Sequence, residues 1–245
     1  MLNGLKAVLY REYTVFRKRA VKQIISSSVP PLLFLIAFGW GLGRQVNVGD
    51  LPYISFLVPG LIAMNSLNQC FAISAEINIA RFYFHTFDEY LIAPVSEYEV
   101  VLGLTIFGMF RGFLSTLIIF IYTLLFGVQL ILNPVFFIAL AMHAFIFSAL
   151  AVTTSMLVQD HSGQNLVTSF VITPMIFLCG TFFPVDKLPT AFKYLVLALP
   201  LTYSTKVIRA TLTGGAVQYG YIYVLLIYCI IFFITAIWTL KRVEA

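Results

Sequence analysis

The chain has 245 residues, of which 60% are hydrophobic and only 10% are charged. Soluble domains carry about 25% charged residues, so this composition excludes a water-soluble globular domain and indicates a chain that lies in a lipid bilayer. The formal net charge is +5. Because the basic residues crowd the first 22 positions, they indicate membrane topology and contact with anionic lipid, and not nucleic-acid binding.

Residues 1–23 are predicted to form an amphipathic helix at the membrane interface. Apolar side chains recur at helical spacing on one face, namely Leu2, Leu5, Leu9, Tyr13 and Phe16, and the opposite face carries Arg11, Thr14 and Lys18. We expect the apolar face to lie in lipid and the cations to point toward the headgroups. The six Lys and Arg side chains in this segment place the N-terminus in the cytoplasm. Residues 24–245 then form the transmembrane domain.

Six segments are apolar enough and long enough to cross a bilayer, which takes about 20 residues. They run from Ile24 to Leu42, Tyr53 to Ile79, Val100 to Gly127, Pro134 to Val158, Asn165 to Pro184 and Tyr219 to Leu240. The predicted fold is an all-α membrane protein with six transmembrane helices. The even number of spans brings the C-terminus to the cytoplasmic side as well. One conflict remains, since the external loop before the last span carries Lys187, Lys193, Lys206 and Arg209.

The cytoplasmic loop between the second and third spans contains FDEYLIAPVS, residues 87–96. We predict a short helix over Phe84–Pro94 that ends at the proline, because proline disfavours helical geometry in the residue before it. Its two acids have no nearby Lys or Arg except Arg81, and a basic partner protein would explain them. The alternative is a solvated amphipathic turn. The candidate contact residues are Phe84, Phe87, Asp88, Glu89, Leu91 and Pro94, of which Phe84, Phe87 and Leu91 are expected on one helical face.

A second long loop runs from Pro184 to Gly215, between the fifth and sixth spans. It contains a moderately apolar piece, Phe192 to Leu199, bounded by Pro189 and Pro200. This piece is too short to cross the bilayer. Backbone at membrane depth is tolerated where it packs against protein or lines a cavity. We therefore expect a pair of re-entrant or interfacial helices on the outer face.

The ionisable side chains inside the expected spans are Glu76, Arg111 and His143. Such groups are costly in lipid and tend to face protein or water. Glu76 and Arg111 are close enough to the cytoplasmic half to pair with each other. A structural salt bridge or a snorkelling end residue is the plainer interpretation, and substrate contact or gating is the alternative.

Motifs for covalent chemistry are absent from the sequence. It contains no GxxxxGKS or GxxxxGKT phosphate loop, no GxSxG, no HExxH and no CxxC. The three cysteines, Cys70, Cys179 and Cys229, fall in separate expected spans and are interpreted as small buried apolar residues. We therefore expect no catalytic residue, no metal site and no cofactor in this chain.

Several segments, taken in chain order, resemble the ABC-2-type transport permeases, the membrane subunits of bacterial ATP-binding-cassette exporters. After the basic N-terminal helix they are VPPLLFLIAFGWGLG (29–43), YISFLVPGLIAMNSL (53–67), FDEYLIAPVSEYEVVLG (87–103), RG (111–112), TPMIFLCGTFFPVDKLP (173–189) and ALPLTY (198–203). The resemblance covers nearly the whole chain. GWGLG and ALPLTY are most similar to permeases linked to daunorubicin-type drug resistance and to nodulation lipo-oligosaccharide export.

The resemblance implies an export permease of the bacterial inner membrane. It implies a homodimer with two copies of a separate ATPase subunit, which binds ATP and Mg²⁺. The Phe84–Pro94 helix would be the coupling helix that docks on the ATPase through Asp88, Glu89 and Leu91, and residues 1–23 would be the connecting helix beside it. Spans two and five would line the path of an amphipathic, lipid-like or drug-like cargo, a class that includes glycolipids and oligosaccharides. The residues nominated for this path are Asn65, Asn68, Phe71, Thr168, Thr173, Met175, Phe177 and Phe182.

Two rival functions are weighed against this one. An ion- or proton-coupled secondary transporter without an ATPase would want acidic relays or a clear internal repeat. The sequence offers a thin repeat, a proline in both FLVPGL and VITPMI. A membrane-embedded enzyme would want clustered His, Asp or Glu near the interface, a pattern that the sequence lacks. For the polar path residues, hydrogen bonding between helices is the alternative to contact with cargo.

Overall fold

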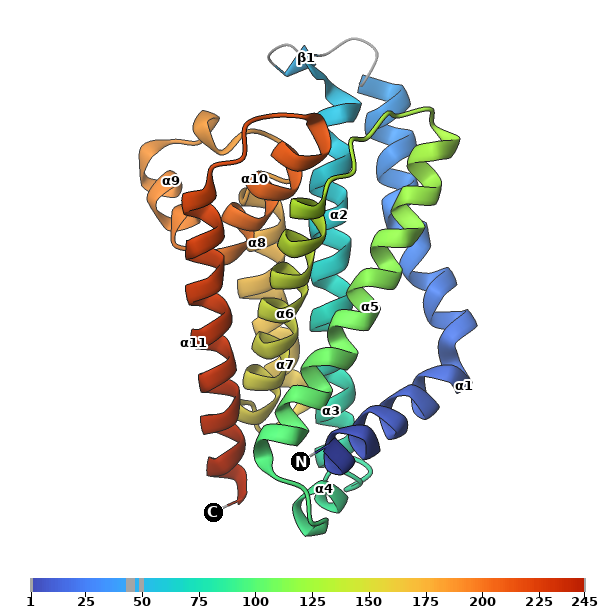
Figure 1. Ribbon diagram of the computed structural model, residues 1–245, viewed down its shortest axis with the longest axis vertical. Coiled ribbons are helices and arrows are strands. Elements are labelled where there is room, and N and C mark those ends of the chain that lie inside the picture. The colour runs from blue at the N-terminus through green and yellow to red at the C-terminus, as the bar shows by residue number, and fades with distance from the viewer. Residues whose placement is uncertain (1, 43–46, 49–50, 245) are drawn as a thin grey trace.

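A computed structural model describes residues 2–42, 47–48 and 51–244 of the chain. Figure 1 shows a bundle of long helices that run along the longest axis of the molecule. Both ends of the chain and the short helix α4 (Asp88–Ile92) lie at one end of the bundle, which we call the α4 end. The helices α9 (Thr190–Leu197) and α10 (Pro200–Thr213) lie toward the other end, which we call the α10 end. The expected all-α class is confirmed, with one small exception: β1 (Asn47–Val48) pairs antiparallel with β2 (Leu51–Pro52).

Among the described residues, five helical segments are long and apolar enough to cross a membrane. They are α1 (Leu2–Phe34) with the π-helical segment η1 (Leu35–Leu42), α2 (Tyr53–Phe71) with α3 (Ile73–Phe82), α5 (Glu97–Leu125), α6 (Pro134–Leu157) and α11 (Tyr219–Glu244). The expected fifth span, Asn165–Pro184, does not belong to this set. It folds as α7 (His161–Val167), η2 (Thr168–Ile172) and α8 (Thr173–Leu178), and a turn then leads to η3 (Val185–Lys187).

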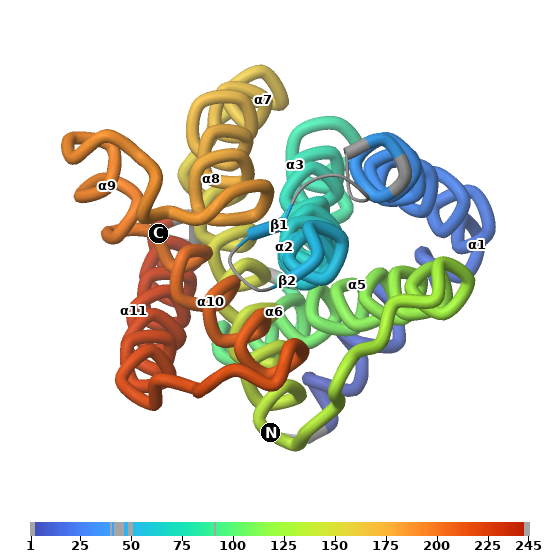
Figure 2. The backbone as a smooth tube through the Cα atoms, turned by 90° about the horizontal axis from the view of Figure 1, so that it is seen from above, coloured from blue at the N-terminus to red at the C-terminus, as the bar shows by residue number. Residues whose placement is uncertain are grey.

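The core of the bundle is built around α2. Figure 2 shows α2 at the centre, with α5, α6 and α8 around it. Most of the α2 side chains are buried, whereas few residues are buried along the apolar stretches of α1 and α11. Small residues permit close contact, since a Cβ on Gly112 of α5 would lie 2.4 Å from Cys70 Sγ of α2. Cys70 and Cys179 are fully buried, as expected, and Cys229 is partly exposed.

The sequence predicted that the apolar face of α1 lies in lipid, but in the structure α1 packs against protein. Its first turns pack against α5, where Gly103 leaves room for Val8: a Cβ at Gly103 would lie 2.6 Å from Val8 Cγ1. Phe16 packs edge-on against Phe107 and Phe110 of α5, with both ring centroids at 5.9 Å. Tyr13, expected on the same apolar face, is half exposed. The helix therefore rests on protein through a face rotated from the expected one. The side chain of Leu2 lies outside the described residues.

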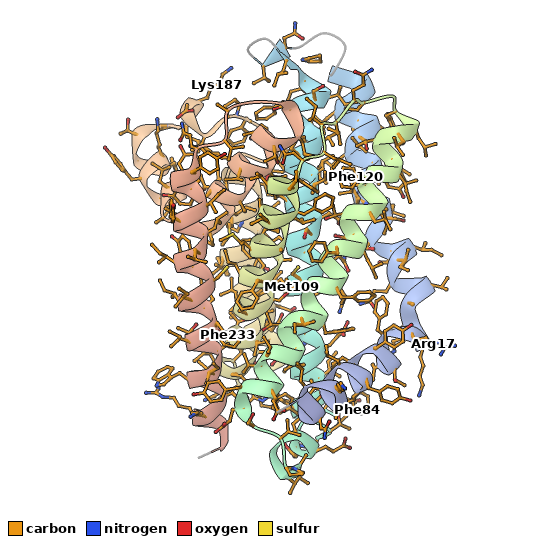
Figure 3. The ribbon with its side chains drawn as sticks, in the orientation of Figure 1. Arg17, Phe84, Met109, Phe120, Lys187 and Phe233 are labelled. Atoms are coloured by element: carbon orange, nitrogen blue, oxygen red, sulfur yellow. The ribbon has the colours of Figure 1, made fainter. Side chains whose placement is uncertain are left out.

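α1 also continues without a break through the boundary expected at residue 23. Figure 1 shows that the helix bends on its way from the α4 end into the bundle. Figure 3 places Arg17 at this bend, with its side chain pointing away from the other helices. The N-terminal arm and the first expected span are thus two parts of one bent helix.

The α10 end is tied to α2 by Arg209, one of the basic residues that conflict with the topology rule. Arg209 Nη2 donates to the Gly180 carbonyl at 2.6 Å, and Nε donates to the Phe56 carbonyl at 3.2 Å. Its guanidinium also lies 3.7 Å from the centroid of the Phe56 ring. Because the Arg209 side chain is bound within the protein, its charge says little about which side of the membrane this loop lies on.

Candidate functional site

The loop between α3 and α5 contains a helix shorter than predicted. Helix α4 spans Asp88–Ile92, while Phe84 lies in the preceding turn, where His85 has a left-handed φ of 53°. Phe84 is 60% exposed and Phe87 is 1% exposed, so the prediction that they share one helical face is wrong. The predicted ending is confirmed, since Ala93 is extended at ψ 150° immediately before Pro94.

The outer face of α4 is acidic. Asp88 and Glu89 are exposed, and among the described residues neither carboxylate lies within 4.0 Å of a Lys or Arg nitrogen. Asp88 lies 3.9 Å from the ring of His85, which carries charge only if protonated. Ile92 is 83% exposed beside these acids. The surface thus combines two acids that make no direct ion pair with Lys or Arg and one exposed apolar side chain. The side chain of Leu91 lies outside the described residues.

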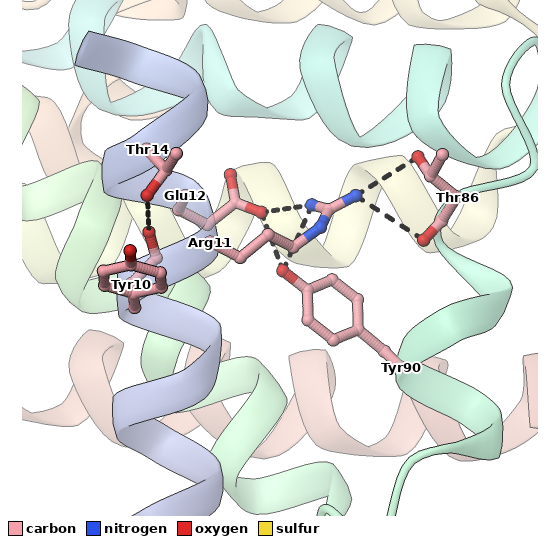
Figure 4. A network of polar contacts seen from close by, with 6 residues as sticks. All are labelled: Tyr10, Arg11, Glu12, Thr14, Thr86 and Tyr90. Carbon is pink, nitrogen blue, oxygen red and sulfur yellow. Dashed lines mark hydrogen bonds and ion pairs between the residues drawn. The ribbon is translucent and has the colours of Figure 1, made fainter.

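The inner face of α4 is fastened to α1 by a polar network, shown in Figure 4. The Tyr90 hydroxyl donates to Glu12 Oε1 at 2.8 Å, and Arg11 Nη1 donates to the same oxygen at 2.6 Å. Arg11 Nη1 also donates to the Tyr90 oxygen at 3.2 Å, and its Nη2 donates to Thr86 Oγ1 at 3.2 Å. The Arg11 guanidinium lies 4.8 Å from the centroid of the Tyr90 ring. We call these four residues, Arg11, Glu12, Thr86 and Tyr90, the α1–α4 network.

The central residues of the α1–α4 network are buried. Glu12 is 9% exposed and Tyr90 is 8% exposed, and Phe87 packs edge-on against the Tyr90 ring at 5.5 Å between centroids. Burial and the neighbouring Glu12 carboxylate raise the pKa of the Tyr90 hydroxyl, although Arg11 lowers it. The hydroxyl therefore keeps its proton and remains a donor to Glu12. α4 is held from inside by Tyr90 and Phe87, and it presents Asp88 and Glu89 outward.

Sequence reasoning missed this network and placed Arg11 on the headgroup side of α1. In the structure the Arg11 side chain is 28% exposed and turned toward α4. A signal for it was present, because Glu12 is the one acidic residue among the first 49 positions of a strongly basic segment. An isolated acid next to an arginine in such a segment is a candidate for a buried ion pair.

Within the bundle, Glu76 and Arg111 pair, which is one of the arrangements that the sequence predicted. Arg111 Nη1 donates to Glu76 Oε1 at 2.7 Å, and Gln23 Nε2 of α1 donates to the same oxygen at 3.0 Å. The Arg111 side chain is 2% exposed and that of Glu76 is 41% exposed. The pair joins α3 to α5, and through Gln23 it also holds α1. His143 is fully buried, and its Nδ1 lies 2.9 Å from the hydroxyl oxygen of Ser204.

The residues nominated for a cargo path do not form one surface within the chain. Four of them are buried in the bundle, namely Asn65, Phe71, Met175 and Phe182, and four are exposed, namely Asn68, Thr168, Thr173 and Phe177. Phe182 packs with Phe34, Phe38 and Phe177 at 5.2–6.1 Å between ring centroids. The hydroxyls of Thr168 and Thr173 donate to carbonyls of their own helical segment. The exposed four have side chains open to the surroundings of the chain, whereas the buried four pack inside the bundle.

Comparison with known families identifies the kind of protein. The family model described as ABC-2 type transporter matches residues 3–213. The chain belongs to the ABC-2 type transporter family. The match includes α1, α4 and the helices that carry the network, the Glu76–Arg111 pair and the nominated path residues.

Individual relatives agree with this assignment. Nodulation protein J of Rhizobium leguminosarum bv. viciae is 28% identical over 98% of this chain and 95% of its own length. Nodulation protein J of Rhizobium meliloti is 29% identical over 85% of this chain and 81% of its own length. The inner membrane transport permease YadH of Escherichia coli K12 is 25% identical over 82% and 79%, respectively. Together with the five long apolar helices, these matches indicate a transport subunit of the inner membrane.

Proposed function

We propose that this chain is the permease subunit of an ATP-driven exporter and that it works as a homodimer with two separate ATPase subunits. ATP and Mg²⁺ would be held by the ATPase, and this chain would carry no catalytic residue. The observation that supports this most is α4, a short helix whose outer face bears two exposed acids without a Lys or Arg ion pair while its inner face is anchored to α1. Such an acidic face is complementary to a basic surface on a partner protein, because opposite charges attract and like charges repel across an interface.

The topology belongs to the same proposal. The N-terminus, the C-terminus and the α4 end would lie in the cytoplasm, and the α10 end would lie outside. α7, η2 and α8 would supply the fifth of six spans, with their polar and exposed side chains directed at the second copy and not at lipid. α9 and α10 would form the re-entrant pair. Their position at the end of the bundle opposite α4 supports this arrangement.

In the proposed mechanism, ATP binding draws the two ATPase subunits together and pushes on α4. The α1–α4 network passes this movement to α1, and α1 passes it to α5 through the Val8–Gly103 and Phe16 contacts. The path between the two copies would then change its access from inside to outside, and ATP hydrolysis would reset it. We propose an amphipathic, lipid-like or drug-like cargo, a class that includes glycolipids and oligosaccharides. Asn68, Thr168, Thr173 and Phe177 are the nominated residues with side chains open to it.

The test is co-purification with the candidate ATPase. The tagged chain is expressed with its neighbouring genes, purified in mild detergent, and its partners are identified by mass spectrometry. We expect an ATPase with a phosphate-binding loop in a ratio of one per chain. The double variant Asp88→Lys and Glu89→Lys should lose the ATPase while still inserting in the membrane, because it places like charges against the expected basic surface.

Asp186→Lys is the control at the other end of the molecule, since Asp186 is also an exposed acid but lies in η3, next to Lys187 in Figure 3, where it pairs with Lys193 at 3.1 Å. It should keep the ATPase. If the unaltered, folded chain brings no ATPase at all, the proposal fails and a secondary transporter takes its place. If the double variant keeps the ATPase at full strength, α4 is not the docking site.

A further inference from the structure

The bend of α1 carries an unpaired cluster of cations. Arg17, Lys18, Arg19 and Lys22 lie within six residues and are all exposed. Among the described residues, none of the four makes an ion pair or a hydrogen bond. This differs from Arg11 only two turns earlier, which is bound to Glu12, Tyr90 and Thr86. The fold itself leaves the charges of these four residues uncompensated.

The four cations lie along an open hollow on the surface of α1. The hollow has a volume of about 630 Å³, and its lining consists of their side chains together with Val21, Ile25 and Ser26, all from this one segment of the helix. The lining therefore combines four cations with two exposed apolar side chains. We call it the basic hollow.

An apolar stripe leads away from the basic hollow along the outer face of α1. Val21, Ile25, Val29 and Leu33 follow one another at intervals of four residues, and they are 73%, 59%, 45% and 58% exposed. Residues four apart on a helix are neighbours on its surface, so these four side chains form a continuous stripe that winds gradually around α1. From Val21 to Leu33 the helix rises about 18 Å, because each residue adds about 1.5 Å. That length is close to one leaflet of a hydrocarbon core that is about 30 Å thick. We call these four residues the α1 stripe.

A phospholipid with a negative headgroup has the shape and charge that these two features require. We propose that the basic hollow and the α1 stripe together bind one anionic phospholipid of the surrounding bilayer. Its phosphate lies among Arg17, Lys18 and Lys22, and one acyl chain lies along the α1 stripe. Basic residues next to a transmembrane helix attract anionic headgroups, and the exposed stripe adds the apolar contact that a free phosphate cannot make. The proposed lipid site requires a membrane but no ATPase, so its test is independent of the proposed function.

Native mass spectrometry of the purified full chain measures the retained lipid directly. The probes are dioleoyl phosphatidylglycerol and dioleoyl phosphatidylcholine, which share their acyl chains and differ in headgroup charge. We expect the chain to retain one phosphatidylglycerol in clear preference to phosphatidylcholine, and the preference should fall as salt rises. Equal retention of the two lipids would overturn the proposal.

The site variant replaces three cations: Arg17→Gln, Lys18→Gln and Lys22→Gln. It should bind phosphatidylglycerol about a hundredfold more weakly, since each of the three cations contributes on the order of 1 kcal/mol to anionic-lipid binding and about 1.4 kcal/mol is a factor of ten. The matched control replaces three cations elsewhere, Lys187→Gln, Lys193→Gln and Lys241→Gln, and should retain the lipid as the parent chain does. Retention by both variants, or loss by both, contradicts the site.

Two further arms separate this lipid from the other occupants. Glycerol 3-phosphate at millimolar concentration tests for a free phosphate. We expect it to leave the bound lipid in place, and displacement would assign the basic hollow to soluble phosphates. Ile25→Cys tests for a second copy of the chain on the α1 stripe. Formation of an intermolecular disulfide at this position would show that the stripe is a protein interface, whereas a free thiol is the expected result.

Discussion

The two ends of the bundle are each fastened by an arginine, and the two fastenings differ in kind. At the α10 end, Arg209 donates to the backbone carbonyls of Phe56 and Gly180. At the α4 end, Arg11 donates mainly to side chains, those of Glu12, Tyr90 and Thr86. Backbone carbonyls are fixed by the fold, whereas side-chain partners separate by a change of rotamer. We therefore expect a more rigid α10 end and an α4 end whose connection to α1 opens without unfolding the bundle.

The largest expected effect follows from breaking the α10 end. Arg209→Met keeps most of the aliphatic length and removes both donors and the contact with the Phe56 ring. We expect the free energy of unfolding to fall by about 2–3 kcal/mol, since hydrogen bonds from charged groups contribute about 1.5–3 kcal/mol each and part of the exposed carbonyl surface regains water. The measurement is the melting temperature in detergent, reported by a thiol-reactive dye in a Cys229→Ser background, because Cys229 is partly exposed whereas Cys70 and Cys179 are fully buried until the chain unfolds.

Arg209→Lys is the control for charge. A lysine keeps the positive charge but cannot donate in the forked geometry to two carbonyls, so it should restore only part of the lost stability. If Arg209→Met melts at the same temperature as the parent chain, the α10 end is not held by this residue and the comparison between the two ends fails.

At the α4 end we expect a smaller loss of overall stability and a larger local increase in hydrogen exchange. Glu12→Leu removes the shared acceptor of Arg11 and Tyr90 and fills the buried position with an apolar side chain. Arg11 is 28% exposed and can turn to water, so the loss of stability should be about 1 kcal/mol. The detached α4 should exchange its amide hydrogens faster. Hydrogen exchange on a peptide that covers residues 83–95 measures this, with residues 200–213 of the α10 end as the internal reference.

Glu12→Gln provides the graded comparison, since its amide oxygen still accepts from Tyr90 but bears no charge for Arg11. We expect exchange at residues 83–95 between those of the parent chain and of Glu12→Leu. Equal protection of this peptide in all three proteins would mean that α4 is held by packing alone, through Phe87.

The sequence predicted the elements that depend on local composition. It did not predict the side-chain orientations that depend on contacts between distant segments. Five of the six expected spans fall on long apolar helices, and the break at Pro94 came from the local restriction that proline imposes. The orientation of Arg11 was wrong, because helical spacing assumed lipid beneath α1, and Gly103 of α5 admits protein there instead. The burial of Phe87 beside an exposed Phe84 depends on the turn at His85, and nothing in the spacing of the apolar residues indicates that turn.

The nominated site shows the same division. The pairing of Glu76 with Arg111 was within reach of the sequence, since charges in lipid seek each other. The third member of that group, Gln23, was not, because only the bend of α1 brings it to Glu76 Oε1. For the cargo path, polarity alone nominated both Asn65, which is buried, and Asn68, which is exposed, three residues apart on one helix. Sequence polarity says that a side chain avoids lipid, but the packing of the helices decides whether it faces the core or an open surface.

The smallest change that still separates the two ends is the loss of one hydroxyl group. Tyr90→Phe keeps the ring against Phe87 and beneath the Arg11 guanidinium, and it removes both the hydrogen bond to Glu12 and the weaker one that the hydroxyl accepts from Arg11. Because Arg11 still pairs with Glu12, we expect a loss of stability of at most about 1 kcal/mol and a melting temperature close to that of the parent chain. Exchange at residues 83–95 should nevertheless rise. Tyr228→Phe is the matched control, since its hydroxyl donates to the Ala198 carbonyl at the α10 end. A rise in exchange at residues 83–95 in both variants would show that the α4 end responds to any loss of packing order, and the distinction between a rigid end and an opening end would be lost.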